Sequence, residues 1–175
     1  KSILKNCAIE PEIKDLILFL KKLGAQIKIS GRTITISEGK IIKLPIVHEI
    51  IFDRIEAGTY MIASALIGKK VIIDKIDPKI IKYEIDTLKK MGVKIKKFRG
   101  SLRIEKNKIL KKTNITTQPY PGFPTDLQAQ LMVLMTQASG VSKISENIFE
   151  NRFMHVPELR RMGAKIKINN KTAFI

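Results

Sequence analysis

The chain has 175 residues, of which 44% are hydrophobic and 28% are charged, a balance typical of a folded globular protein rather than a disordered one. Its 33 Lys and Arg against 16 Asp and Glu give a formal net charge of +17. The sequence has no run of about 18 uncharged apolar residues, which excludes a membrane-spanning helix. We recognise no export leader, and a single cysteine excludes a disulfide framework, so we expect a cytoplasmic location.

The positive charge is compatible with an anionic substrate or with nucleic acid. However, 26 of the 33 cations are Lys and 31 residues are Ile, which is typical of a biased genome composition. The lysines are spread along the chain, and only 10 Phe and Tyr with no Trp are present to stack on bases. We therefore expect no nucleic-acid or membrane partner, and keep a basic, repeat-built nucleic-acid-binding module as the alternative.

A short motif occurs three times along the chain. LKKLGAQIKI begins at Leu20, LKKMGVKIKK at Leu88 and LRRMGAKIKI at Leu159, at offsets of 68 and 71 residues. Each copy predicts the end of a helix, a glycine at a left-handed C-cap, and an alternating strand. A polar turn and a second short strand follow. The glycines are Gly24, Gly92 and Gly163, and the turns are Ser30-Gly31-Arg32, Arg99-Gly100-Ser101 and Asn169-Asn170-Lys171.

Each motif is preceded by a predicted amphipathic helix. The first should begin at Pro11, and the second at an N-cap and N1 pair, Asp77-Pro78. Their expected buried stripes are Ile13, Leu16, Ile17, Leu20 and Leu23 for the first, and Ile81, Ile85, Leu88 and Met91 for the second.

A further helix is predicted before the second and the third copy, starting at Asp53 and at Thr125, 72 residues apart. Both starts have the pattern of a capping box, Asp53 with Glu56 and Thr125 with Gln128. Small residues on one face should allow close packing against a neighbour. They are Ala57, Gly58, Ala63, Ala65, Ala129 and Ala138.

These patterns predict an α/β unit of about 70 residues with a sheet on one side and helices on the other. The chain cuts across the units, because it begins in the strand before the first helix and ends within the last strand of the third unit. Residues 40–51 have no helical pattern and contain Pro45, so we place the domain boundary there.

The segments FDRIEAGTY, PGFPTDLQAQ and IFENRFMHVPELRRMGA closely resemble the UDP-N-acetylglucosamine 1-carboxyvinyltransferases, a family of enolpyruvyl transferases that opens peptidoglycan synthesis. The match runs through the whole chain, starting with NCAIEPEI. A sister family, the 3-phosphoshikimate 1-carboxyvinyltransferases, shares the repeat and is the second alternative. The resemblance implies transfer of the enolpyruvyl group from phosphoenolpyruvate to the sugar 3-hydroxyl, and with it roles in cell-wall formation, cell shape and division.

The resemblance also implies an inside-out α/β barrel of six such units in two domains, with the active site between them. Residues 1–42 would be the last unit of one domain, 43–52 the interdomain crossover, and 53–175 two units of the second domain, cut at the C-terminus. The chain would then be well under half of the enzyme and inactive alone.

Asp126 is the strongest candidate for catalysis. From the residues alone it would be an acidic residue in a first helical turn, although Pro121, Gly122 and Pro124 restrict its approach. The resemblance makes it the group that bonds the sugar 3-hydroxyl and serves as general base. It also assigns a main-chain contact with the UDP-sugar to Ile148. Arg152 and Asp53 are candidates for lining the cleft.

Other parts of the family's site have no counterpart in this sequence. The catalytic cysteine loop, a Lys-Asn pair and later arginines that hold phosphoenolpyruvate are absent, and Cys7 lies elsewhere in the repeat, where we expect a small buried residue. We interpret His155 as structural. We expect no metal and no cofactor; the partners implied are UDP-N-acetylglucosamine, phosphoenolpyruvate and the remainder of the enzyme.

Overall fold

The structure is a computed structural model that describes residues 1–40, 42, 45–68 and 70–175. It divides into two compact units, Lys1–Ile51 and Phe52–Ile175. Of the expected crossover, residues 43 and 44 lie outside the described residues. The assignment of the two units to two domains of one enzyme stays a prediction. Among the described helices, none is long and apolar enough to cross a membrane.

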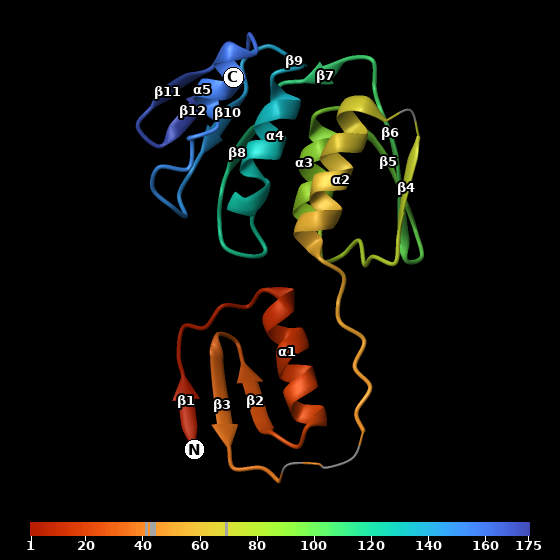
Figure 1. Cartoon of the computed structure of the whole chain (residues 1–175), viewed down its shortest axis with the longest axis vertical. Coiled ribbons are helices and arrows are strands. Elements are labelled where there is room, and N and C mark those ends of the chain that lie inside the picture. Colours follow the sequence, from red (N-terminus) through yellow and green to blue (C-terminus); the bar gives the residue numbers. More distant parts are fainter. Residues whose placement is uncertain (41, 43–44, 69) are drawn as a thin grey trace. The chain divides into compact units, whose positions relative to one another are not determined.

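The smaller unit is a three-stranded antiparallel sheet with one helix on its face (Figure 1). Its elements are β1 (Ser2–Leu4), α1 (Pro11–Lys22), β2 (Gln26–Ser30) and β3 (Thr33–Ser37). Ile17 of α1 packs against Ile27 and Ile34 of the sheet, as the helical stripe predicts. The prediction is wrong for Leu16, which is 51% exposed. Cys7 is only half-buried, since it lies in the connection between β1 and α1 at the edge of this core.

The larger unit contains two more copies of the same arrangement. Its elements are α2 (Arg54–Ile67), β4 (Val71–Asp74), α3 (Lys82–Lys90), β5 (Lys94–Phe98), β6 (Ser101–Glu105), β7 (Leu110–Lys111), β8 (Asn114–Thr116), the 3-10 helix η1 (Thr125–Leu127), α4 (Gln128–Met135), β9 (Ala138–Ser139), β10 (Lys143–Ser145), α5 (Val156–Arg161), β11 (Lys167–Asn169) and β12 (Thr172–Phe174).

The sheet orders confirm the repeat predicted from sequence. The orders β1-β3-β2, β4-β6-β5 and β10-β12-β11 are the same, and β8 extends the third sheet by a parallel pairing with β10. In each copy the helix ends at a glycine with positive φ, +99° at Gly24, +90° at Gly92 and +96° at Gly163. A side chain disfavours this conformation, which is why the motif carries glycine there.

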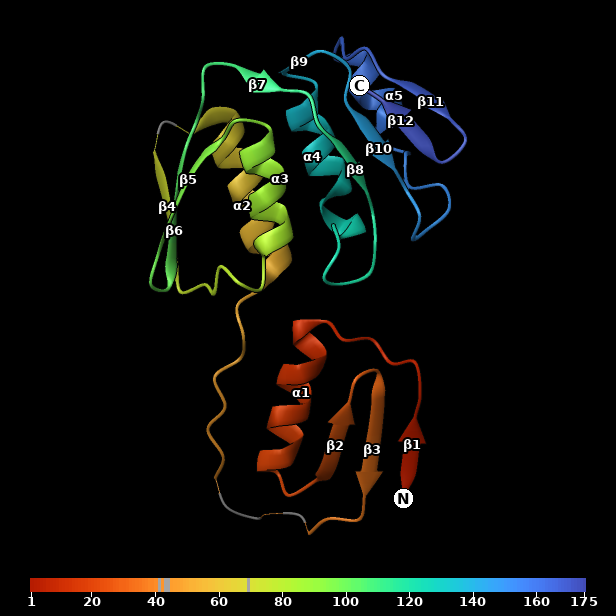
Figure 2. The same cartoon turned by 180° about the vertical axis from the view of Figure 1, so that it is seen from behind.

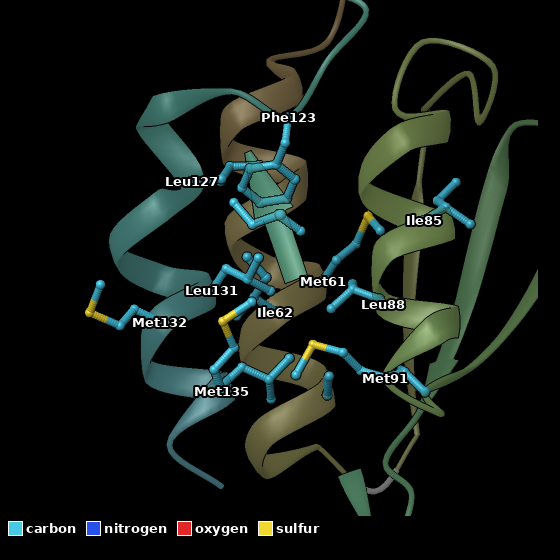
Figure 3. Packing of buried hydrophobic residues seen from close by; sticks show 14 of the residues in the cluster. Met61, Ile62, Ile85, Leu88, Met91, Phe123, Leu127, Leu131, Met132 and Met135 are labelled. Atoms are coloured by element: carbon cyan, nitrogen blue, oxygen red, sulfur yellow. The ribbon is translucent and has the colours of Figure 1, made fainter. Parts of the chain in front are cut away.

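Helices α2, α3 and α4 lie between the β4-β6-β5 sheet and the sheet of β8, β10, β11 and β12 in both views (Figures 1 and 2), and β7 and β9 form a further two-stranded parallel sheet. Leu127, Leu131 and Met135 point toward α2, whereas Met132 points from the other side of α4 (Figure 3). The close packing predicted from small residues is confirmed at Gly58, where an added Cβ would lie 2.3 Å from Leu127 Cδ1. Of the other small residues, Ala138 lies in β9 rather than in a helix.

The predicted helix starts have different outcomes. Asp53 caps α2, because its Oδ1 accepts hydrogen bonds from the backbone N–H groups of Ile55 (2.7 Å) and Glu56 (3.0 Å). The prediction for Asp77-Pro78 is wrong, because these residues open a turn and α3 begins later, at Lys82. At Thr125 a helical segment does begin, first as η1 and then as α4, but the predicted capping box is wrong, because no side chain of the described residues caps either helix and the Thr125 hydroxyl donates to Glu146.

Candidate functional site around Glu146 and Asp126

Glu146 is the centre of a hydrogen-bond network between segments that follow β8 and β10. It is 2% exposed. Its Oε1 accepts hydrogen bonds from Thr117 Oγ1 (2.7 Å) and from the backbone N–H groups of Ile148 (2.9 Å) and Phe149 (3.2 Å). Its Oε2 accepts one from Thr125 Oγ1 (2.8 Å). One buried carboxylate therefore connects the loop before α5 with the residue next to Asp126.

The charge state of Glu146 follows from these bonds. Burial by itself raises the pKa of this carboxyl group, because the interior disfavours a charge. The hydroxyl of Thr117, the N–H of Ile148, the hydroxyl of Thr125 and the N–H of Phe149 all donate to the carboxylate, and together they lower its pKa below the ordinary value. Glu146 is therefore an anion that accepts several bonds, and it stabilises the loop rather than moving a proton.

Asp126 and Arg152 form an ion pair at the surface of this network. Arg152 Nη2 donates to Asp126 Oδ1 at 2.7 Å, and its Nε donates to Thr125 Oγ1 at 3.3 Å. The Arg152 guanidinium also lies 5.3 Å from the centre of the Phe149 ring. The side chains of Asp126 and Arg152 are 56% and 41% exposed, so a ligand can reach both. At this exposure the pair contributes little to stability.

Ile148 lies in the same network through its backbone. It is half-buried, and its N–H is already bonded to Glu146. A main-chain contact with a ligand would therefore have to use its carbonyl oxygen. Three of the predicted site residues, Asp126, Ile148 and Arg152, are thus brought together although 26 residues separate the first from the last.

Two hollows adjoin Arg152, with volumes of about 640 and 320 Å³, within or near the size range of small-molecule sites. The larger is lined by Glu146, Phe149, Glu150, Asn151, Arg152, Phe153, Met154, Ile168, Asn170 and Lys171. The smaller is lined by Thr125, Asp126, Gln128, Ala129, Asn151, Arg152, Met154 and His155. Phe149 and Met154 are largely exposed, which adds apolar surface beside the charged pair.

His155 is a half-buried residue that lines the smaller hollow. Its Nε2 is 3.3 Å from Met132 Sδ on α4. Burial lowers the pKa of this imidazole, and the positive charge of Arg152 lowers it further. A neutral ring between α4 and the start of α5 fits the structural interpretation from sequence.

Asp53 does not take part in this network among the described residues. Its carboxylate instead caps α2. The sequence reasoning also missed Glu146 and Thr117. Glu146 has the sequence signal of an ordinary surface residue, a charged side chain in a polar loop, and its hydroxyl partners are 21 and 29 residues away. No local pattern could have identified it.

The arrangement can bind a polar ligand that carries hydroxyl groups. An exposed carboxylate accepts a hydrogen bond from a hydroxyl and can then take its proton, and the adjacent guanidinium can bind an anionic group. Among the described residues, no group of three or more His, Cys, Asp or Glu is placed to hold a metal ion. The expectation of no cofactor stays a prediction.

The sequence of the chain is similar to those of a known protein family. The sequence matches the family EPSP synthase (3-phosphoshikimate 1-carboxyvinyltransferase) over residues 1–175. It is 53% identical to the UDP-N-acetylglucosamine 1-carboxyvinyltransferase of Pelagibacter ubique and 49% identical to that of Halothermothrix orenii, in both cases over all of this chain and 42% of the relative. The chain thus spans well under half the length of the curated relatives it matches.

Solved structures show the same fold. The enolpyruvyl transferase NikO from Streptomyces tendae superposes with a TM-score of 0.88 at 25% identity, over 99% of this chain and 42% of that one. EPSP synthase from Acinetobacter baumannii superposes with a TM-score of 0.61 at 18% identity, over 89% of this chain and 38% of that one. The fold class expected from the repeats, a part of the enolpyruvyl transferase α/β fold, is therefore confirmed.

Proposed function

The chain belongs to the EPSP synthase family of enolpyruvyl transferases, and we propose that it forms part of an enzyme that transfers the enolpyruvyl group of phosphoenolpyruvate to the 3-hydroxyl of UDP-N-acetylglucosamine. This reaction would open peptidoglycan synthesis. A cytoplasmic location, expected from the lone cysteine, belongs to the same proposal.

The observation that carries the proposal is the Asp126–Arg152 pair, which lies beside two hollows on a chain 53% identical to a relative named for this activity. The sister shikimate-pathway activity has weaker support. EPSP synthase from Acinetobacter baumannii shares the fold at 18% identity, whereas relatives named for the UDP-sugar are 42–53% identical to this chain over the matched residues.

The proposed role of Asp126 is that of general base. Its exposed carboxylate would accept the proton of the sugar 3-hydroxyl while that oxygen bonds to C2 of phosphoenolpyruvate and C3 takes a proton from a donor in the remainder of the enzyme. Loss of a proton from C3 would then re-form the double bond as the bond from C2 to the phosphate oxygen breaks, which releases inorganic phosphate and gives the enol ether. Arg152 would hold the carboxylate in place at 2.7 Å and face the anionic substrates. The carbonyl of Ile148 would contact the UDP-sugar.

The remainder of the enzyme would supply the other groups. The phosphoenolpyruvate ligands and the proton-donating cysteine loop implied by the family resemblance have no counterpart among these 175 residues. We therefore expect no phosphate release from this chain by itself with both substrates, and release from the full-length protein.

Replacing Asp126 by Ala in the full-length protein tests the base assignment. Loss of a general base lowers rates by about 10²- to 10⁴-fold, and we expect a fall of kcat in this range in a phosphate-release assay with UDP-N-acetylglucosamine and phosphoenolpyruvate. The thermal midpoint should change little, because the side chain is 56% exposed.

Asp74→Ala, at an exposed aspartate on β4, is the matched control and should keep full activity. Full activity of Asp126→Ala would remove the base assignment. Phosphate release by the unaltered protein with shikimate 3-phosphate in place of the UDP-sugar would overturn the proposed substrate.

A further inference from the structure

Residues 118–124 form the loop that leads from β8 to Asp126. The loop is closed on itself by hydrogen bonds from the N–H of Gln118 to the carbonyl of Phe123 (3.0 Å) and from the N–H of Gly122 to the carbonyl of Pro119 (2.8 Å). A Cβ added at Gly122 would lie 2.5 Å from Gln118 Cβ, so the turn leaves no space for a side chain. The residues of this loop are thus tied to one another, so a contact that holds one of them also restrains the chain that leads to Asp126, in addition to the bonds of Thr125 and Asp126 themselves.

Two aromatic rings anchor the loop to helices α2 and α3. Phe123 is 1% exposed, and its ring meets that of Tyr83 edge-on at 6.3 Å between centres. The other ring is that of Tyr120, and the Arg54 guanidinium carbon lies 5.7 Å from its centre. A guanidinium over a tyrosine face is attracted by the ring's electron density, most strongly where water is excluded.

Arg54 is buried, which is unusual for an arginine. It is the first residue of α2 and is only 9% exposed. Glu84 of α3 is 4% exposed and lies within the electrostatic reach of Arg54, whose positive charge lowers the pKa of Glu84 against the larger effect of burial. The buried guanidinium of Arg54 thus lies near an acidic side chain and over the face of an aromatic ring, and both contacts restrict its orientation.

We propose that Arg54 and Tyr120 are positioning residues for Asp126: the guanidinium on α2 holds the Tyr120 ring and thereby fixes the loop that presents the carboxylate. The inference rests on the proposed function for its kinetic consequence, but the anchoring of the loop stands independently of it. The Phe123–Tyr83 contact buries one part of the loop, and the Arg54–Tyr120 contact fixes the other.

The first measurement is hydrogen exchange in the full-length protein, which needs no activity. Tyr120→Leu and Arg54→Met should raise exchange in peptides covering residues 117–127 and leave peptides of β5 and β6 unchanged. Tyr120→Phe keeps the ring that faces Arg54 and should raise exchange far less than Tyr120→Leu. Tyr60→Leu removes an exposed tyrosine from the same helix as Arg54 and is the control. Unchanged exchange in the loop of both Tyr120→Leu and Arg54→Met would overturn the anchoring.

The second measurement is steady-state kinetics of the same variants. A displacement of a reacting group by about 1 Å can lower a rate by about 100-fold, so we expect kcat to fall by about 10- to 100-fold in Tyr120→Leu, with the KM for phosphoenolpyruvate little changed. Tyr120→Phe, which keeps the ring, should lower kcat far less than Tyr120→Leu. A purely structural role would lower the thermal midpoint and leave kcat of the folded protein intact, which would overturn the positioning role.

Together the two measurements distinguish a failure of the proposed function from a failure of the proposed anchoring. Suppose that the unaltered protein has no transferase activity, but that exchange in the loop rises in Tyr120→Leu. This result would contradict the proposed function and support the anchoring of the loop. If kcat falls, and exchange in the loop rises, as much in Tyr120→Phe as in Tyr120→Leu, the effect belongs to the hydroxyl group. That result would overturn the role of the ring face.

Discussion

Glu84 and Glu146 are both buried carboxyl groups of the larger unit, yet their pKa values move in opposite directions. Burial raises both. At Glu146, four donated hydrogen bonds outweigh burial and the pKa falls. At Glu84, the backbone N–H and the charge of Arg54 offset burial only in part, and the pKa rises to about 7. The charge of each carboxyl group therefore depends on how strongly it is desolvated and on the donors aimed at it.

Glu84 makes the stability of the larger unit depend on pH. Its pKa is about 7 in the folded protein against 4.5 for an ordinary glutamate, so between these values the folded state binds more protons than the unfolded one. The free energy of unfolding should therefore fall as pH rises from 4.5 to 7, by about 3 kcal/mol.

Glu84→Gln should remove this dependence, because the amide does not titrate. The measurement is the thermal midpoint of the full-length protein at pH 5 and pH 8 for the variant and for the unaltered protein. The variant should be the more stable of the two at pH 8. Glu150→Gln, at an exposed position, is the control, and parallel pH curves for Glu84→Gln and the unaltered protein would contradict the prediction.

At the scale of elements, helix α2 shows how sequence signals and packing combine. Asp53 caps its first turn as the sequence predicts. The equivalent signal at Thr125 fails, because Thr125 is itself the first residue of η1 and its side chain takes tertiary partners instead. Its hydroxyl donates to Glu146 and accepts a hydrogen bond from Arg152 Nε. A capping residue is therefore predictable only where no tertiary partner holds its side chain away from the helix end.

The substitution Gly58→Ala in α2 should have two opposite effects on the stability of the protein. Helix propensity favours Ala over Gly by about 1 kcal/mol, but the new Cβ would lie 2.3 Å from Leu127 Cδ1. Overpacking of this kind costs about 1 to 3 kcal/mol, so we expect a net loss of stability in denaturant unfolding. Gly58→Ala combined with Leu127→Ala should relieve the contact, and a stabilised single variant would show that α2 and α4 can separate without cost.

At the scale of the whole molecule, the buried hydrophobic side chains of the described residues fall into two clusters, one in each compact unit. The smaller cluster is centred on Ile17, Ile27 and Ile34. The larger one runs from Ala57 to Ala173 and joins both repeats of the second unit into one core. The repeats of the larger unit are therefore not independent modules.

Leu131→Ala tests this continuity. Leu131 is fully buried between α4 and α2, and removing a buried leucine side chain costs about 2 to 5 kcal/mol. Hydrogen exchange should rise in both repeats of residues 52–175, because they share the core. Ile17→Ala, the matched change in the other cluster, should raise exchange within residues 1–51. If the increase in hydrogen exchange in Leu131→Ala is confined to one repeat, each repeat has its own core.

The sequence by itself determined the repeat, the left-handed glycines, the turns and the family, because each depends on residues close together in the chain or on long matching strings. The resemblance also led to the prediction that Asp126, Ile148 and Arg152 are site residues. The tertiary structure alone decided what joins these residues. Glu146, Thr117 and the Arg54–Tyr120 contact come from segments far apart in sequence, and whether a charge is exposed, hydrogen-bonded or buried depends on what the fold places around it.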